Sequence, residues 1–181
     1  AREVILLNLI EDFGGRVFNT GGDSVLAEFS SALDAVECAA AFQLRIAEIN
    51  SLPETECHLE FRIGINMGDV VQKDKDLLGD GVNIAARLEA FAQQSGVCIS
   101  KSVYDLVAPK TNLVFNDLGL QRIKNNRFHA VDLILPHTKK RVRSQAIKKK
   151  VTIFLALTCL IFGAVLSASF LLPKNDQFKD N

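Results

Sequence analysis

The sequence has few of the side chains that cross-link chains or bind zinc. Its 181 residues include four cysteines and three histidines, and no two cysteines form a CxxC pair. This argues against a disulfide framework and a zinc site, and it fits a reducing compartment. A secretory signal is also missing from residues 1–13. The chain begins with Ala1 rather than methionine, so we expect a fragment of a longer protein.

A net charge is missing too, because 21 basic residues balance 21 acidic ones. This argues against a dedicated nucleic-acid-binding protein, which carries a basic excess. The basic and acidic residues are, however, unevenly distributed along the chain. Residues 1–138 hold 12 basic and 19 acidic side chains, whereas residues 139–150 hold seven basic and none acidic.

Charge and proline are absent from residues 151–172. A helix of this length rises roughly 33 Å at about 1.5 Å per residue, enough to cross a hydrocarbon core of roughly 30 Å. The basic cluster before this segment predicts a single-pass protein of the inner or plasma membrane, with residues 1–150 in the cytoplasm. We therefore expect a basic juxtamembrane linker at 137–150, a transmembrane helix at 151–172 and the start of an extracytoplasmic region at 173–181.

The remaining region, residues 1–136, has the patterning of a mixed domain. Apolar spacing predicts helices at 3–13, 30–50, 82–93 and 101–107. Alternation and turn residues predict strands at 16–20, 24–29, 58–66, 70–72, 97–100, 112–117 and 128–135. The first two strands form one expected hairpin, residues 58–72 form another, and residues 73–76 form a charged loop. This order favours an α+β or α/β fold with helices packed on a sheet.

The first candidate for chemistry is Asp23, which follows two glycines at the tip of the first hairpin. Glycine allows the close approach of a phosphate or a metal ion, and the carboxylate lies at a sheet edge. The alternative is an aspartate that only forms the turn.

The second candidate is the segment Gly79–Arg87. Asn83 and Arg87 are four residues apart and share one face of the predicted helix. An amide and a guanidinium beside a glycine-rich turn suit an anionic, oxygen-rich ligand, and the alternative is a solvated helix face. Asp80 is expected to cap this helix.

Three blocks in this order are more specific than either motif: GGRVFNTGGDSVLAEF (14–29), FRIGINMGDV (61–70) and GDGVNIAARLEAFA (79–92). With them, residues 4–135 resemble the catalytic domain of class III nucleotide cyclases, most of all the bacterial membrane-attached members. The resemblance implies an α+β fold with a ferredoxin-like, palm-type sheet, incomplete at its N-terminus.

The resemblance also implies an activity, the conversion of ATP to cyclic AMP and pyrophosphate. The ribose 3′-hydroxyl attacks the α-phosphate with the help of two Mg²⁺ or Mn²⁺ ions. Asp23 matches a metal-binding aspartate, Asn83 the residue that orients the ribose, and Arg87 the residue that stabilises the transition state. Asp76 matches a purine-reading position and favours ATP over GTP. The active sites of the family lie between two catalytic domains, which implies a homodimer.

Two departures from the family pattern affect these expectations. Asn19 occupies a second base-reading position that is usually lysine in adenylate cyclases, and its amide carries no charge. The first metal-binding aspartate, on a strand upstream of the opening helix, is absent from the chain. We therefore expect residues 1–181 alone to be inactive.

Two other interpretations remain open. Gly21-Gly22-Asp23 also resembles the signature of diguanylate cyclases, although Ser24-Val25 breaks it. Alternatively, the domain is a degenerate, non-catalytic cyclase that serves as a dimerising signalling module on a membrane anchor.

Overall fold

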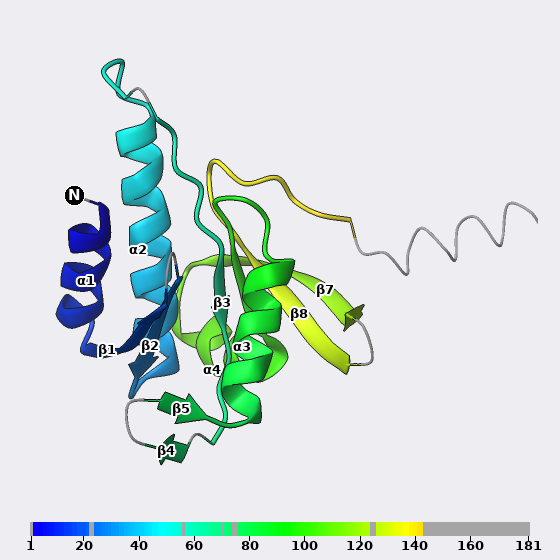
Figure 1. Ribbon diagram of the computed structural model, residues 1–181. Helices are drawn as coiled ribbons and strands as arrows, with labels where there is room; N and C mark the ends of the chain where they lie inside the picture. The colour runs from blue at the N-terminus through cyan, green and yellow to red at the C-terminus, as the bar shows by residue number, and fades with distance from the viewer. Residues whose placement is uncertain are drawn as a thin grey trace, which may run out of the picture. The chain divides into compact units, whose positions relative to one another are not determined.

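The computed structural model describes residues 2–21, 24–55, 57–69, 71–73, 76–123 and 126–142 (Figure 1). One compact unit spans Ala1–Arg141. Its helices are α1 (Arg2–Asp12), α2 (Ala32–Asn50), α3 (Asp80–Phe91), α4 (Lys101–Val107) and a short 3₁₀ turn, η1 (Ala108–Lys110). Its strands are β1 (Gly15–Gly21), β2 (Ser24–Phe29), β3 (Ile63–Ile65), β4 (Val71–Lys73), β5 (Asp76–Leu78), β6 (Val97–Ser100), β7 (Val114–Ile123) and β8 (Asn126–Ile134).

A four-stranded mixed sheet in the order β3-β6-β8-β7 forms the centre of this unit. β3 runs parallel to β6, whereas β8 runs antiparallel to both β6 and β7. Two antiparallel hairpins, β1-β2 and β4-β5, accompany this sheet. The α+β fold expected from the sequence is therefore confirmed.

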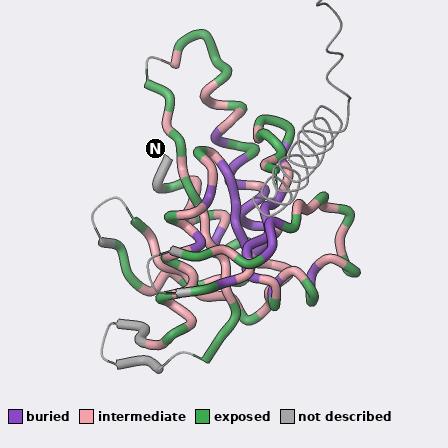
Figure 2. The backbone as a smooth tube through the Cα atoms, turned by 90° about the vertical axis from the view of Figure 1, so that its right-hand side faces the viewer, coloured by how far each residue is buried: buried purple, intermediate pink, exposed green. Residues whose placement is uncertain are grey.

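Helices cover both faces of the central sheet. Successive residues of a strand point to opposite faces, so neighbouring residues of β6 contact different helices. Val97 and Ile99 of β6 pack with the apolar side chains of α2 and α4. Cys98, between them, packs with Leu88 of α3 on the other face. The buried residues gather where these layers meet (Figure 2).

Several predicted elements are confirmed with small shifts of their ends. The first hairpin has the expected strands, and α2 begins after Ser31, whose hydroxyl accepts a hydrogen bond from the Asp34 amide at 3.3 Å. The last two strands were predicted too short. They form one long hairpin, in which a bulge between Asp117 and Gly119 breaks the pairing.

The predicted second hairpin over residues 58–72 is wrong. β3 covers only Ile63–Ile65 and pairs with β6, while β4 pairs with β5 across the segment expected to be a charged loop. Two side chains of α2 hold the residues before β3. Asn50 bonds both the amide and the carbonyl of Leu59, and Gln43 donates to the Phe61 carbonyl at 2.8 Å. The alternation of residues 58–62 therefore reflects packing against a helix, not a strand ladder.

The predicted cap of α3 is also wrong. The N-cap is Gly79, with φ 151° and ψ 162°, and no side chain caps the helix. This backbone conformation is essentially restricted to glycine. Asp80 instead lies in the first turn, where its negative charge interacts favourably with the positive end of the helix dipole.

The predicted transmembrane helix, residues 151–172, and most of the basic linker lie outside the described residues. Within the described ranges, the helices are too short or too polar to cross a bilayer. The membrane span therefore stays a prediction from the sequence.

The burial of the cysteines predicts which thiols react. Burial, together with the nearby Asp132 carboxylate, raises the pKa of the Cys98 thiol to about 12. Burial, with Asp12, raises the pKa of Cys38 to about 11. Thiolates are the reactive form, so iodoacetamide at pH 8 should modify exposed Cys57 and leave Cys38 and Cys98 intact until the protein is unfolded.

Peptide mass spectrometry before and after denaturation would measure this difference. Rapid modification of Cys98 in the native protein would show that the α3 face of the sheet is open to solvent, contrary to the structure.

Candidate active site

The two strongest predicted site residues lie on α3. Asn83 is exposed and Arg87 is partly buried, and their spacing places both on one face of the helix. Leu88, fully buried between α3 and the sheet, fixes the rotation of the helix about its axis. Within the described part of the chain, no ion pair or side-chain hydrogen bond joins Asn83 or Arg87 to a neighbour. Both polar groups are therefore available to a ligand.

A direct backbone contact seats α3 on β3. A Cβ atom at Gly64 would lie 2.2 Å from the Ala85 carbonyl oxygen and 2.2 Å from the Glu89 amide nitrogen. Both helix atoms belong to the turns that flank Arg87. Only glycine at this strand position lets the helix approach so closely.

The loop after β3 holds the first turn of α3. The Asn66 side-chain amide donates to the Gly81 carbonyl at 3.1 Å. A Cβ at Gly68 would lie 3.2 Å from the Gly81 Cα, so the two backbones nearly touch. These contacts fix the helix two residues before Asn83. The role of Asn66 was not predicted from the sequence. The close approach at Gly64 has a sequence signal, because a glycine inside an alternating run indicates close contact between backbones.

The hairpin β1-β2 carries the other predicted residues of the N-terminal block. Asn19 is exposed on β1 and pairs with Leu26, just after a register shift between Val17 and Asn19. A bulge of this kind changes the direction in which a side chain points. Asp23, the predicted metal ligand, lies outside the described residues, between Gly21 and Ser24, which pair across the hairpin.

Asp76 is the first residue of β5 and pairs with Lys73 of β4. β5 contacts both β1 and α3, and the three elements meet near one end of the unit (Figure 1). The structure therefore brings together the elements that carry Asn19, Asp76, Asn83 and Arg87.

The residues that the structure describes do not form a metal site. Nowhere among them do three or more histidine, cysteine, aspartate or glutamate side chains gather in one place. The predicted ligand Asp23 lies outside these residues, so the two-metal site stays a prediction.

The sequence and the fold both match known proteins. Residues 8–134 match the family described as "Adenylate and Guanylate cyclase catalytic domain". The chain belongs to this family. The resemblance found in the three sequence blocks is thus confirmed, and the helix with Asn83 and Arg87 lies inside the matched region.

Two curated relatives are named as adenylate cyclases. "Putative adenylate cyclase 3" of Rhizobium meliloti (strain 1021) is 47% identical over 122 residues, which cover 67% of this chain and 21% of that protein. "Adenylate cyclase" of Streptomyces coelicolor is 32% identical over 99 residues, 55% of this chain and 24% of that protein. The chain thus spans only about a quarter of these relatives or less.

Solved structures show the same fold. The adenylate/guanylate cyclase/hydrolase from Silicibacter pomeroyi has a TM-score of 0.69 at 34% identity, with 75% of this chain and 81% of that chain covered. The adenylyl cyclase CyaB from P. aeruginosa has a TM-score of 0.60 at 19% identity, with 78% and 82% covered. The second likeness supports the fold alone.

The contact at Gly64 gives a prediction for the stability of the domain. Gly64→Ala should destabilise the domain by about 1–3 kcal/mol, the usual cost of overpacking, because neither helix atom is the end of a flexible side chain. Denaturant unfolding followed by circular dichroism would measure the loss.

Ala86→Ser, on the exposed face of the same helix, is the matched control and should change stability by less than about 0.5 kcal/mol. Equal stability of Gly64→Ala and the parent would mean that α3 does not rest on β3 as described.

Proposed function

We propose that the chain is the catalytic domain of an adenylate cyclase, which converts ATP to cyclic AMP and pyrophosphate. The observation that carries this proposal is the exposed face of α3, where an amide and a partly buried guanidinium lie four residues apart and lack protein partners among the described residues. The names of the two curated relatives support adenine nucleotide as the substrate.

Each side chain on this face has a separate task in the proposed reaction. The Asn83 amide hydrogen-bonds the ribose and directs its 3′-oxygen towards the α-phosphorus. As that oxygen attacks and the bond to pyrophosphate breaks, negative charge grows on the α-phosphate oxygens. The Arg87 guanidinium donates to these oxygens and stabilises the charge.

The base is read from the other side of the site. Asp76, on β5, accepts a hydrogen bond from the 6-amino group of adenine, which guanine lacks. Asn19, on β1, supplies a second, uncharged contact to the purine edge. The contacts of β5 with both β1 and α3 support this division of roles.

Divalent cations belong to the proposal through the family resemblance. When bound, Mg²⁺ or Mn²⁺ would neutralise phosphate charge and lower the pKa of the ribose hydroxyl. We assign Asp23 to cation binding because it matches the family position.

The proposed assembly is a homodimer with two symmetric sites at its interface. The exposure of Asn83 supports it, because an open helix face needs a second surface to enclose a nucleotide. We also propose that residues 151–172 anchor the protein in the inner or plasma membrane with the catalytic domain in the cytoplasm, on the strength of the charge asymmetry.

One observation favours a second candidate. Asn19 stands where adenylate cyclases usually have lysine, which is a change expected of a domain that has lost catalysis. This alternative is a non-catalytic dimerising module with the same fold.

Activity measurements separate the two candidates. The longer protein that carries this domain should form cyclic AMP from ATP with Mn²⁺ or Mg²⁺. Arg87→Ala or Asn83→Ala should lower kcat by about 10²- to 10³-fold, the usual loss when one transition-state donor is removed, and Asp23→Ala should abolish the product.

Arg45→Met is the control, because Arg45 makes only an exposed pair with Glu48 on α2. Cyclic GMP as the main product would show that the base contacts are misassigned. A folded, dimeric protein without product from either nucleotide would favour the non-catalytic module.

A separate variant tests the base contact at Asn19. Asn19→Lys replaces a neutral donor with a charged one, and such bonds differ by about 1 kcal/mol. We expect kcat/KM for ATP to rise about fivefold, with little change for GTP. An equal rise for both nucleotides would place residue 19 near the phosphates instead of the purine.

A further inference from the structure

The segment after the last strand returns to the domain instead of leaving it. This C-terminal connector, residues 135–141, begins with a tight turn in which the Thr138 amide donates to the Leu135 carbonyl at 3.0 Å. His137 Nε2 lies 3.0 Å from the Ser95 carbonyl oxygen. The connector lies outside the region matched by the family, residues 8–134.

The connector ends in an ion pair between partly buried Arg141 and buried Asp132. Arg141 Nε donates to Asp132 Oδ2 at 2.6 Å, and its terminal nitrogen Nη2 bonds Asp132 Oδ1. Asp132, on β8, is only 1% exposed. A carboxylate so deeply buried requires a charged partner, and the planar fork of arginine satisfies both of its oxygens.

The same guanidinium reaches α3. Nη1 donates to the Phe91 carbonyl at 2.9 Å, and the guanidinium carbon lies 4.4 Å from the centre of the Phe91 ring. Phe91 is the last residue of α3, so its carbonyl has no partner within the helix. The positive charge of Arg141 at this end also interacts favourably with the negative end of the helix dipole.

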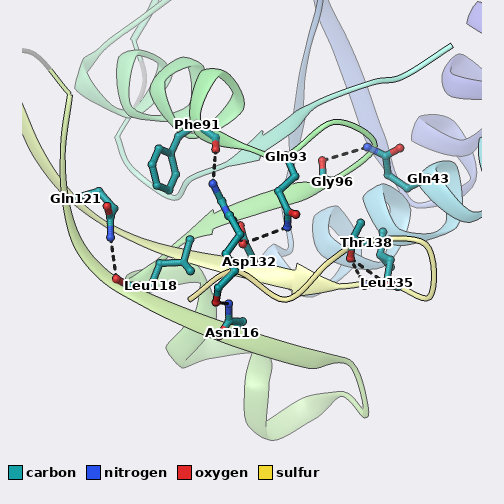
Figure 3. Close-up of polar contacts among 11 residues, drawn as sticks. Gln43, Phe91, Gln93, Gly96, Asn116, Leu118, Gln121, Asp132, Leu135 and Thr138 are labelled. Carbon is teal, nitrogen blue, oxygen red and sulfur yellow. Dashed lines mark hydrogen bonds and ion pairs between the residues drawn. The ribbon is translucent and has the colours of Figure 1, made fainter. Parts of the chain in front are cut away.

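Further contacts hold this arrangement from the sheet side. Asn116 of β7 donates its side-chain amide to the Arg141 carbonyl at 2.8 Å. Gln93, just after α3, donates to Asp132 Oδ2 at 3.4 Å (Figure 3). Burial by itself lowers the pKa of Arg141, but the hydrogen bond and the charge of Asp132 outweigh it and raise the pKa. Arg141 therefore keeps its positive charge at physiological pH.

We propose that Arg141 is a positioning residue, which holds the C-terminal end of α3 and couples the connector to the helix that carries Asn83 and Arg87. Phe91 lies one helical turn beyond Arg87, so a shift of the helix end also moves the Arg87 guanidinium. Arg141 is the last residue of the connector, so a displacement of the connector acts on α3 through the Arg141 side chain. The catalytic consequence rests on the proposed function, whereas the coupling itself does not.

Two variants of the longer protein test the coupling. Arg141→Met removes the contact with Phe91 but leaves the Asp132 charge buried and unpaired, which can prevent folding. Asp132→Asn/Arg141→Met removes both charges, so that the double variant keeps a neutral core. Arg45→Met, which removes an exposed arginine of α2, is the matched control.

Hydrogen exchange measured by mass spectrometry is the first readout. In the double variant, the amides of residues 88–92 should exchange at least tenfold faster, while those of the buried stretch of α2 keep the wild-type rate. Arg45→Met should change neither segment. If the protein is a cyclase, kcat in the double variant should fall at least tenfold, with KM within about twofold.

Unchanged exchange at residues 88–92 would overturn the proposal. Equal acceleration in α2 and α3 would also overturn it, because it would show a general loss of stability and not a local release of α3. If the wild type makes no cyclic nucleotide but α3 alone responds to the double variant, the proposed function fails while the coupling stands.

Discussion

The contact between the backbone of α3 and that of β3 at Gly64 determines where the candidate site lies. The usual layer of side chains between a helix and a strand is absent at this point. The position of α3 is therefore set by main-chain atoms, which have little freedom to move. Asn66 and Gly81 add a second fixed point at the helix start, and Arg141 adds a third at its end.

Two arginines near α3 use their positive charges in different ways. Near the end of the helix, a guanidinium from the connector is paired with a buried carboxylate and is wholly used in holding the structure. One turn earlier, the Arg87 guanidinium has no carboxylate partner in the described part of the chain. A paired cation makes a rigid support, and an unpaired one remains open to an anion. One arginine on α3 and another that contacts its next turn can thus serve chemistry and structure separately.

Much of this arrangement was predictable from residue patterns. Helices and strands with strong local signals, such as α2 with its Ser31 cap, were predicted almost to the residue, and so was the shared face of Asn83 and Arg87. The partner of β3 was not, because parallel pairing leaves no local sequence signal. The alternation at residues 58–62 was misleading, since side chains of α2 can bury one side of an extended segment just as a sheet does.

The support at Arg141 could not be predicted either. A lysine- and arginine-rich segment is typical of a membrane boundary, and its pattern does not distinguish a solvated arginine from a buried one. Only the position of Asp132, on the inner side of β8, selects Arg141 from its neighbours. That choice depends on contacts between residues far apart in the chain.

The parallel pairing of β3 with β6 also has a consequence for the order of folding. The β7-β8 hairpin closes between neighbouring segments, whereas β3 meets β6 only after the chain between them has folded back with α3. Long-range closures of this kind are slow compared with hairpins. When the complete domain refolds, we therefore expect the hairpin to form early and α3 to dock on β3 late.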